Sequence, residues 1–477
     1  MVLHAQPRVP GDTTEALPAE YRARELQRGA ACMSGTSTLN VIIVGAGLAG
    51  LACAADLAAA GLSVTVLECA DGVGGRMRTD RVNTDRVNTG RVNTGRRDRF
   101  LLDRGFQVFN TSYPQVQRRL DLRALQLSPF TPGMLLHTRT GRLRFADPTR
   151  RPGDQGDLIR GHLAGPGGLA ALAALSARDM LLPARLVKHG PDQSTLATLA
   201  SARIPGELVE LLFRPFLAGV FLEDQLETSG RFFHLVWRSM LRGTLCLPRR
   251  GIQAVPEQLA AALPPGTVQL ETPVRTLTGQ GVLLADGREL PAGAVVVATG
   301  AAAAAALLPG LPVPDTRTVT TVYHAAPASP LAEPTLLVDT SGEVLNTCVL
   351  SEVSPGYAIG RSLISTSVLG GGGAGREPAV RARLADLYET CTADWEHLAS
   401  YTVDGALPAM PAPLRLSQPC RVPEGGLGGA SPDSASPDSA GLGGPRRYVC
   451  GDHRATGSVQ GALASGARAA RELLADC

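Results

Sequence analysis

Lysine is almost absent from this sequence. Lys188 is the only one, so arginine supplies nearly all of the 46 basic residues, which face 43 acidic ones. Any mechanism that needs a lysine side chain must therefore use Lys188. The net charge of +3 is close to balance, which argues against a nucleic acid or another polyanion as the main partner.

The cysteines and the apolar runs also exclude several classes of protein. Nine cysteines occur, an odd number, and no two have C-x-x-C spacing. This favours neither a disulfide framework nor a metal site, and it is typical of a reducing compartment, so we expect a cytoplasmic protein. There is no run of eighteen apolar residues and no apolar core of a secretory signal. We predict that residues 1–38 are a disordered extension or, since Met33 precedes the first strand, a mis-started one.

What the sequence does have is a strand, a glycine-rich turn, a helix and a second strand in succession. Residues 39–44 are a β-branched run typical of a buried parallel strand. Residues 51–60 are rich in alanine and predict a helix that ends at Gly61. Residues 62–67 predict the second strand, which Glu68 closes. Together they form one βαβ unit.

The turn in this unit carries the G-x-G-x-x-G fingerprint of dinucleotide binding, read here as Gly45-Ala46-Gly47-Leu48-Ala49-Gly50. The first glycine permits the tight turn, the second lets the backbone approach a pyrophosphate, and the third permits close helix packing. The helix N-terminus presents free N–H groups and a partial positive charge to the phosphates. Glu68 is placed to hold ribose hydroxyls. We predict that residues 45–50 and Glu68 bind a dinucleotide.

A second glycine-rich segment indicates which dinucleotide is bound. Gly74 and Gly75 allow the backbone to fold back over a pyrophosphate, and Arg76 supplies a fixed cation. A nicotinamide-dependent dehydrogenase needs no such second clamp, whereas a tightly held FAD does. The sequence therefore favours FAD as the cofactor.

The βαβ unit followed by Gly-Gly-Arg-Met-Arg-Thr resembles the flavin-containing amine oxidase and phytoene desaturase superfamily. Residues 450–466, Cys-Gly-Asp-His-Arg-Ala-Thr-Gly-Ser-Val-Gln-Gly-Ala-Leu-Ala-Ser-Gly, are similar to its second flavin-binding motif. The resemblance implies that Gly451 and Asp452 meet the flavin chain and that Val459 offers its backbone N–H to the ring. It also implies that the backbone of Val274 meets the adenine. A helix N-terminus aimed at the ring stabilises the anionic reduced flavin.

The fold implied is α/β, with a Rossmann-type FAD-binding domain of the glutathione-reductase kind and a discontinuous α+β substrate-binding domain. Signals of the nucleotide domain recur at the start, in the middle and near the end of the sequence. The predicted parts of the FAD domain are 39–105, 250–310 and 447–477, those of the substrate domain are 106–249 and 311–420, and 421–446 is a linker.

Three further elements are expected from local patterns. The tandem pentapeptides at 81–95 and 431–440 are polar and rich in turn formers, so they predict expanded surface loops, the first of them spanning 80–95. The segment 377–399 predicts a helix.

The branch of the superfamily is indicated by two departures from the amine oxidases. Those enzymes typically carry a lysine that holds a water near flavin N5, and tyrosines that flank the amine. Lys188 lies in a predicted linker, and Ser458 takes the place of a cage tyrosine. Both departures favour the desaturase-like branch, whose substrates are long apolar isoprenoids.

A cluster of aromatic residues supports an apolar substrate, because aromatics make up only 4% of the sequence. Such a cluster is suited to lining a tunnel for a polyene, although a buried helix pair needs the same side chains for its core. The members of the predicted pocket are Phe213, Phe216, Phe232, Phe233 and Trp237.

We expect a carotenoid-like substrate to lose a hydride to flavin N5, a step that needs little acid–base machinery because the cofactor carries it. His453 and Arg454 follow Asp452 and are the candidate catalytic residues, His453 for proton transfer and Arg454 for stabilising reduced flavin. A structural hydrogen bond is the alternative role for each. No metal site is expected.

Three other functions share these motifs: an amine oxidase, a redox-neutral carotenoid isomerase, and a non-catalytic escort protein for prenyl groups or lipids. The intact glycines, Glu68, Arg76 and Asp452 favour an enzyme over the escort protein. Because an apolar substrate comes from a membrane, we expect a peripheral membrane contact. The electron acceptor is not indicated by any motif.

Overall fold

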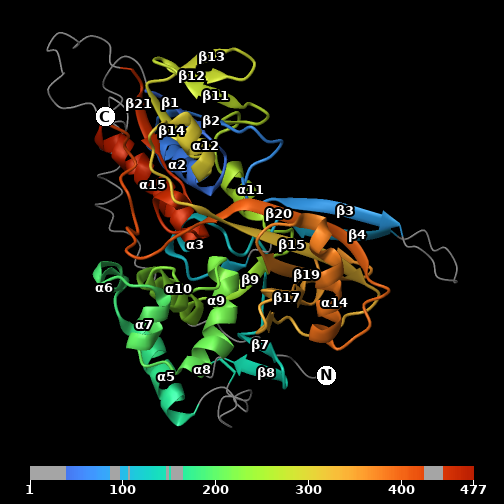
Figure 1. Ribbon diagram of the computed structural model, residues 1–477. Coiled ribbons are helices and arrows are strands. Elements are labelled where there is room, and N and C mark those ends of the chain that lie inside the picture. The colour runs from blue at the N-terminus through green and yellow to red at the C-terminus, as the bar shows by residue number, and fades with distance from the viewer. Residues whose placement is uncertain (1–38, 86–96, 106–107, 147–149, 152–164, 424–443) are drawn as a thin grey trace, which may run out of the picture.

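The protein was analysed as a computed structural model, which describes residues 39–85, 97–105, 108–146, 150–151, 165–423 and 444–477. A parallel sheet of five strands occupies the top of the molecule in Figure 1. Its order is β10-β2-β1-β14-β21, and all neighbours are parallel. The strands are β10 (Val268–Gln269), β2 (Ser63–Leu67), β1 (Asn40–Val44), β14 (Ala294–Val297) and β21 (Arg446–Val449).

Both faces of this sheet are covered, which explains why its central strands are apolar throughout. Val41 and Ile43 of β1 pack toward the helices, and Ile42 and Val44 pack toward a small antiparallel sheet on the other face. The helices are α2 (Leu48–Ala59), α3 (Pro114–Arg119), α11 (Ala254–Ala261) and α15 (Val459–Ala475), whereas α12 (Ala301–Leu307) packs on the other face, beside the small sheet. The small sheet comprises β11 (Val274–Leu277), β12 (Gly281–Leu284) and β13 (Glu289–Pro291).

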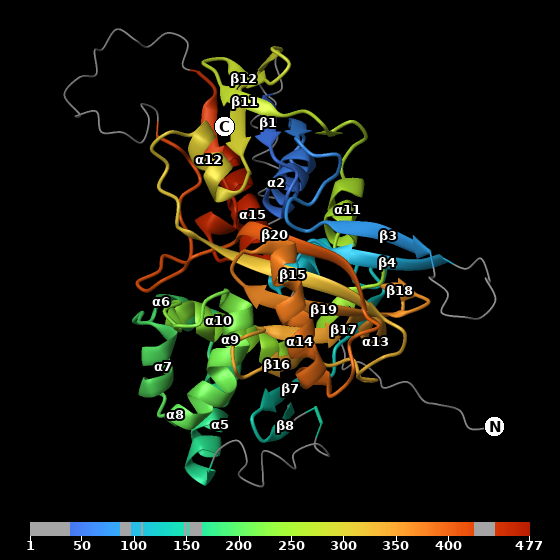
Figure 2. The same ribbon diagram turned by 45° about the vertical axis from the view of Figure 1, so that its right-hand side comes forward.

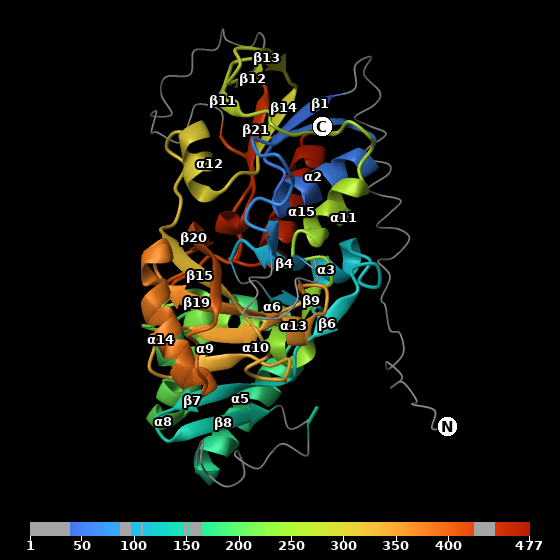
Figure 3. The same cartoon turned by 90° about the vertical axis from the view of Figure 1, so that its right-hand side faces the viewer.

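A mixed sheet of seven strands lies below the parallel sheet in Figure 3. Its order is β20-β15-β19-β17-β16-β7-β8, and helix α14 (Glu377–Tyr388) packs on one face. The strands are β20 (Glu396–Pro408), β15 (Thr316–Ala326), β19 (Ser362–Leu369), β17 (Asn346–Val349), β16 (Leu337–Asp339), β7 (Gly133–Thr138) and β8 (Gly141–Ala146). The long strands β15 and β20 run nearest to the parallel sheet.

A helical layer covers the other side of the seven-stranded sheet and forms the lower left of Figure 1. It contains α5 (Pro166–Leu181), α6 (Ala184–His189), α7 (Thr195–Ser201), α8 (Gly206–Leu208), η2 (Val209–Phe213), α9 (Arg214–Phe221) and α10 (Gly230–Arg242). Its buried apolar side chains form one core with those of β7 and β16.

Short elements join these layers. One small sheet has the strand order β18 (Ala358–Ile359), β4 (Arg97–Asp103) and β3 (Thr79–Asp85). Another has the order β5 (Phe109–Asn110), β9 (Leu245–Pro248) and β6 (Leu127–Pro129). The remaining helices are α13 (Leu350–Val353) and the 3-10 turns η3 (Gly373–Arg376) and η5 (Asp452–Arg454).

The α/β fold class predicted from the sequence is confirmed, and two local predictions are corrected. The predicted helix at 377–399 ends at Tyr388, because Glu389 takes the left-handed conformation with φ +53°, and the chain then enters β20. The predicted loop at 80–95 begins as strand β3, since residues 79–85 pair with β4 over their whole length. Residues 86–96 and the second repeat at 431–440 lie outside the described residues.

Candidate functional site

The first glycine-rich turn connects β1 to α2 at the carboxyl edge of the parallel sheet. Gly45 has φ +107°, and a Cβ there would lie 3.0 Å from the carbonyl oxygen of Ala298 in the neighbouring chain segment. A Cβ on Gly50 would overlap the carbonyl oxygen of Gly45. Gly47 differs, because its Cβ position is open, with no described atom within 4 Å. The turn is therefore held tightly on two sides and free at Gly47.

Glu68 lies against this turn. Its side chain is 7% exposed, its Oε2 accepts a hydrogen bond from the Ala46 N–H at 2.7 Å, and its Oε1 accepts one from the Ala70 N–H at 3.0 Å. The Thr272 N–H donates to the Glu68 carbonyl at 2.8 Å, and Val274 follows two residues later. The structure thus brings the predicted ribose and adenine positions to one edge of the fingerprint turn.

The second glycine-rich segment folds back over the first. The Gly74 N–H donates to the Ala46 carbonyl at 2.9 Å, and Gly74 has φ +119°. Gly75 has φ +59°, and its Cβ position lies 3.8 Å from the Cα of Gly47. The two glycine backbones therefore border the same open space beside the N-terminus of α2, whose N-cap has no side-chain hydrogen bond.

Arg76 joins this clamp to the C-terminal motif. Its Nη2 lies 2.7 Å from Oδ2 of Asp452, and its Nη1 donates to the carbonyl oxygen of Ala406 at 2.8 Å, at the end of β20. Burial disfavours the guanidinium charge, but the Asp452 carboxylate outweighs it and raises the pKa of Arg76. Three segments far apart in the sequence meet at this one side chain.

The C-terminal motif presents a second helix N-terminus to the same region. The Gly451 N–H donates to Oγ of Ser465 at 3.1 Å, and Asp452 starts the turn η5. Helix α15 begins at Val459, and Ser458 is its N-cap, with Oγ accepting from the Gly461 N–H at 3.0 Å. The hydroxyl of Ser458 is therefore engaged in helix capping.

The sequence matches the model of the flavin-containing amine oxidoreductases over residues 48–474. The chain belongs to this family. A comparison with curated proteins finds no match.

Solved structures with the same fold cover nearly the whole chain. One, from Exiguobacterium sp. 255-15, is named as a protoporphyrinogen oxidase; it is 16% identical, covers 93% of this chain and 100% of its own, and has a TM-score of 0.62. Cyclohexylamine oxidase from Brevibacterium oxydans IH-35A is 18% identical, with coverage of 92% and 99% and a TM-score of 0.60. Putrescine oxidase bound to putrescine is 19% identical, with coverage of 92% and 99% and a TM-score of 0.58.

The protein is thus a flavin-dependent oxidoreductase, and FAD, predicted from the sequence, is its cofactor. The residues present fit this group. A bare backbone edge at Gly47 and Gly75 suits close approach of a pyrophosphate, the N-terminus of α2 suits its negative charge, and the N-terminus of α15 suits an anionic reduced flavin ring. The assignment of individual cofactor contacts remains a prediction.

His453 lies in the C-terminal motif of this oxidoreductase but is isolated. Its side chain is 4% exposed, and neither ring nitrogen has a hydrogen-bond partner among the described residues. Nδ1 lies 4.0 Å from Oδ1 of Asp452. Burial lowers the pKa of His453 to about 4, so the ring is neutral near pH 7. A neutral ring with free nitrogens can accept a proton or hydrogen-bond a ligand, but it adds no charge.

Arg454 faces a different environment. It is 8% exposed, its Nη2 donates to the Pro419 carbonyl at 2.7 Å, and its Nε has no partner among the described residues. Burial lowers its pKa. It lines a pocket of about 550 Å³ whose wall is largely the segment 409–423.

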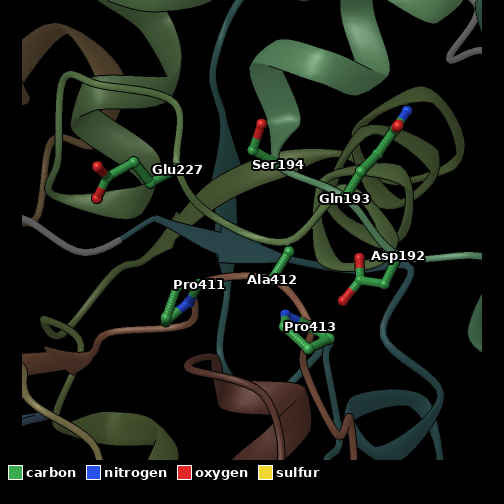
Figure 4. A pocket seen from close by; sticks show the side chains of 7 residues that line it. All are labelled: Asp192, Gln193, Ser194, Glu227, Pro411, Ala412 and Pro413. Atoms are coloured by element: carbon green, nitrogen blue, oxygen red, sulfur yellow. The ribbon is translucent and has the colours of Figure 1, made fainter.

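A second pocket of about 520 Å³ adjoins the first, since both include Pro411 and Pro413. Figure 4 shows Asp192, Gln193 and Ser194 on one side of it, with Pro411, Ala412 and Pro413 opposite.

The predicted pocket aromatics line neither of these two pockets. They are buried and pack against one another: the ring centroids of Phe213 and Trp237 are 5.3 Å apart in a tilted pair, and those of Phe213 and Phe233 are 6.0 Å apart in an edge-to-face pair. Phe216 and Phe232 belong to the same core. This arrangement has the form of helix-pair packing, the alternative considered from the sequence, and a substrate-lining role for these residues remains a prediction.

A buried hydrogen-bond network surrounds Asp103, and no sequence motif indicated it. This carboxylate is 3% exposed and accepts hydrogen bonds from Oγ1 of Thr79 at 2.6 Å, the hydroxyl of Tyr357 at 2.6 Å and the Ile252 N–H at 3.0 Å. The Tyr323 hydroxyl donates to its carbonyl oxygen at 2.8 Å. Burial raises the pKa of Asp103 to about 6. Its partners come from four distant segments, so no local motif could have revealed it.

Proposed function

We propose that this FAD-dependent oxidoreductase dehydrogenates an apolar, isoprenoid-like substrate of the carotenoid type. The observation that carries the proposal is the side chain at position 458, where the resemblance places the cage tyrosine of amine oxidases. A serine there offers no aromatic wall, and its hydroxyl accepts the Gly461 N–H as the cap of α15.

The position of Lys188 supports the same choice. It lies on α6, a short helix that packs on α10, and its side chain is exposed. The cations of the C-terminal motif and the clamp are Arg76 and Arg454, which remain protonated at all ordinary pH values. A lysine that positions a water for amine chemistry is therefore not available from the rest of the chain.

The side chains near the C-terminal motif suit a reaction with little acid–base chemistry. Asp452 is paired with Arg76, and His453 is buried and neutral. Bound FAD would supply the hydride-accepting chemistry. The chain's own part is to hold the cofactor through the two helix N-termini, to neutralise charge with Arg76, and to exclude water around Asp452 and His453, which are 5% and 4% exposed.

The test is the absorbance of the FAD-loaded protein under anaerobic conditions, with a partly saturated polyene in detergent or with benzylamine and putrescine. We expect bleaching of the flavin bands by the polyene alone, with a longer conjugated product on chromatography. Bleaching by an amine alone would overturn the substrate class. A polyene whose double-bond geometry changes while the flavin stays oxidised would replace dehydrogenation by isomerisation.

A further inference from the structure

Three large apolar side chains are exposed to solvent within one short stretch of the chain. Leu181, Leu186 and Leu196 are 80%, 54% and 42% exposed. Among the described residues only two other large apolar side chains are exposed to a comparable degree: Leu270, just after β10, and Ile359 of β18. A concentration of this kind within a short stretch of chain marks an interaction surface more often than isolated exposed leucines do.

The three leucines belong to helices that share one support. Leu181 ends α5, Leu186 lies in α6 and Leu196 in α7, and each of these helices packs on α10. Their buried faces are filled by other residues, Leu172, Leu175, Val187 and Leu199. Figure 2 shows α7 and α5 on the outer and lower parts of the helical layer and α6 at its upper end, on the side of the parallel sheet. The exposed leucines therefore do not contribute to the hydrophobic core.

The charge around Leu181 and Leu186 has one sign, whereas Leu196 lies beside the half-buried Asp192 and the exposed Glu227. Arg178, Arg185, Lys188 and His189 are exposed, whereas Asp179, the only acidic residue between positions 165 and 191, is fully buried. Asp179 is held by His234, whose Nδ1 lies 2.7 Å from Oδ2. Arg178 is ion-paired with Asp179 at 3.2 Å, so we name the surface formed by Leu181, Arg185, Leu186 and Lys188 the apolar–basic face.

We propose that the apolar–basic face docks on the surface of an anionic lipid bilayer. Exposed leucines that project from separate short helices insert into a fluid headgroup layer without needing a shaped partner, and the long basic side chains reach lipid phosphates beside them. None of the helices among the described residues has the length and hydropathy that crossing a membrane requires, so the contact is peripheral. The inference stands on exposure and charge and is independent of the proposed substrate.

The chain that leaves α6 leads from this face to the pocket of Figure 4. The loop between α6 and α7 contributes Asp192, Gln193 and Ser194 to that pocket, and Ser194 caps α7. Asp192 also holds the opposite wall, since its Oδ2 accepts from the Leu414 N–H at 2.7 Å.

The experiment is flotation of the full FAD-loaded chain with vesicles of phosphatidylcholine, alone or mixed with an equal amount of phosphatidylglycerol. We expect binding to the anionic vesicles that weakens as salt is raised. The double variant L181S/L186S and the charge variant R185E/K188E should each lower the vesicle-bound to free ratio at least tenfold. The matched control Ile359→Ser, which removes an exposed apolar side chain elsewhere, should bind like the parent.

Circular dichroism melting of each variant separates lost binding from lost folding. A parent protein that stays in solution with both kinds of vesicle overturns the proposal, as does equal binding by the double variant. If the parent instead forms a dimer in light scattering that L181S/L186S abolishes, a second copy of the chain is the partner and the membrane is not. These outcomes do not depend on which substrate reduces the flavin.

Discussion

At the scale of single residues, the fingerprint glycines divide into two kinds. Gly45 and Gly50 are required by packing, because a Cβ at either would press on the carbonyl oxygen of Ala298 or of Gly45. Gly47 is required by nothing in the protein, since its Cβ position is open. The sequence pattern does not distinguish these glycines. The structure indicates that Gly45 and Gly50 are needed for folding, whereas Gly47 leaves room for a ligand.

This difference predicts opposite results for two alanine substitutions. Gly50→Ala should lower the free energy of unfolding of the flavin-free protein by about 1–3 kcal/mol, the usual cost of overpacking. Gly47→Ala should leave it within about 0.5 kcal/mol of the parent while weakening FAD binding at least roughly tenfold. Denaturant unfolding and quenching of FAD fluorescence measure the two. Unchanged FAD affinity in Gly47→Ala would contradict the placement of the pyrophosphate.

Two buried titratable groups act against each other between pH 4 and pH 6. The pKa of Asp103 is raised to about 6, so its protonated form stabilises the fold at low pH and that contribution is lost as the pH rises through 6. The pKa of His453 is lowered to about 4, so its contribution is present above the ordinary histidine range and is lost as the pH falls toward 4.

We expect the free energy of unfolding of the flavin-free protein to depend weakly on pH in this window, because the two contributions oppose one another. Asp103→Asn should expose the histidine slope, with stability rising with pH by on the order of 2–3 kcal/mol, and His453→Gln should expose the opposite slope. Urea unfolding at pH 4.5, 5.5 and 6.5 gives both. Parallel pH profiles for the parent and both variants would count against these shifts.

At the scale of elements, the decisive contact is the crossing of α2 and α15. A Cβ on Gly466 would overlap the carbonyl oxygen of Ala49, so the two helix backbones touch. Both helices direct their N-termini toward the carboxyl edge of the parallel sheet. The separation of these helices therefore sets the distance between the two predicted phosphate and flavin contacts.

Gly466→Ala should consequently cost about 1–3 kcal/mol of stability and lower FAD affinity as well, because it pushes the helices apart. Gly167→Ala is the control: this glycine lies in α5 with open space around it, and alanine there should stabilise by roughly 0.5–1 kcal/mol. Thermal melting with and without FAD distinguishes the pair. A Gly466→Ala protein that binds FAD like the parent would show that the helices need not touch.

Local pattern explains which elements could be predicted. The two strands and the helix of the βαβ unit follow from apolar periodicity, glycine ends and short loops that the sequence displays within a few residues. Helix α14 was predicted too long because residues 389–399 have no proline, and the left-handed turn at Glu389 uses a residue that does not favour it. Strand β3 was missed because its side chains are mostly polar. Its extended conformation comes from backbone pairing with β4, which the sequence pattern does not reveal.

At the scale of the whole molecule, what the sequence could not reveal are the contacts between distant segments. The seven-stranded sheet pairs β7 with β16, about two hundred residues apart, and the Asp103 network and the ion pair between Arg76 and Asp452 span similar or larger gaps. The motifs identified the cofactor class without these contacts, because each motif is complete within a short segment. The arrangement of the sheets around these motifs depends on strand pairing between distant segments, which no short motif specifies.

Arg76 links the parallel sheet to the seven-stranded sheet, through Asp452 on one side and the carbonyl oxygen of Ala406 on the other. We expect Arg76→Ala to reduce the rise in melting temperature that saturating FAD produces, because it removes a predicted cofactor contact and leaves the buried Asp452 without its ion-pair partner. Arg104→Ala, which removes an exposed pair with Asp80, is the matched control and should keep the full rise. Equal rises in both variants would argue against a cofactor role for Arg76.

The meeting of Arg76 with Asp452 and of α2 with α15 also constrains the order of events during synthesis. The fingerprint turn leaves the ribosome several hundred residues before the C-terminal motif predicted to share its site, and β21 is the last strand of the parallel sheet along the chain. A nascent chain must keep its apolar βαβ unit soluble through most of translation, a delay that favours chaperone engagement. Flavin capture is then a post-translational step, so a shortage of FAD would accumulate complete chains rather than stalled ones.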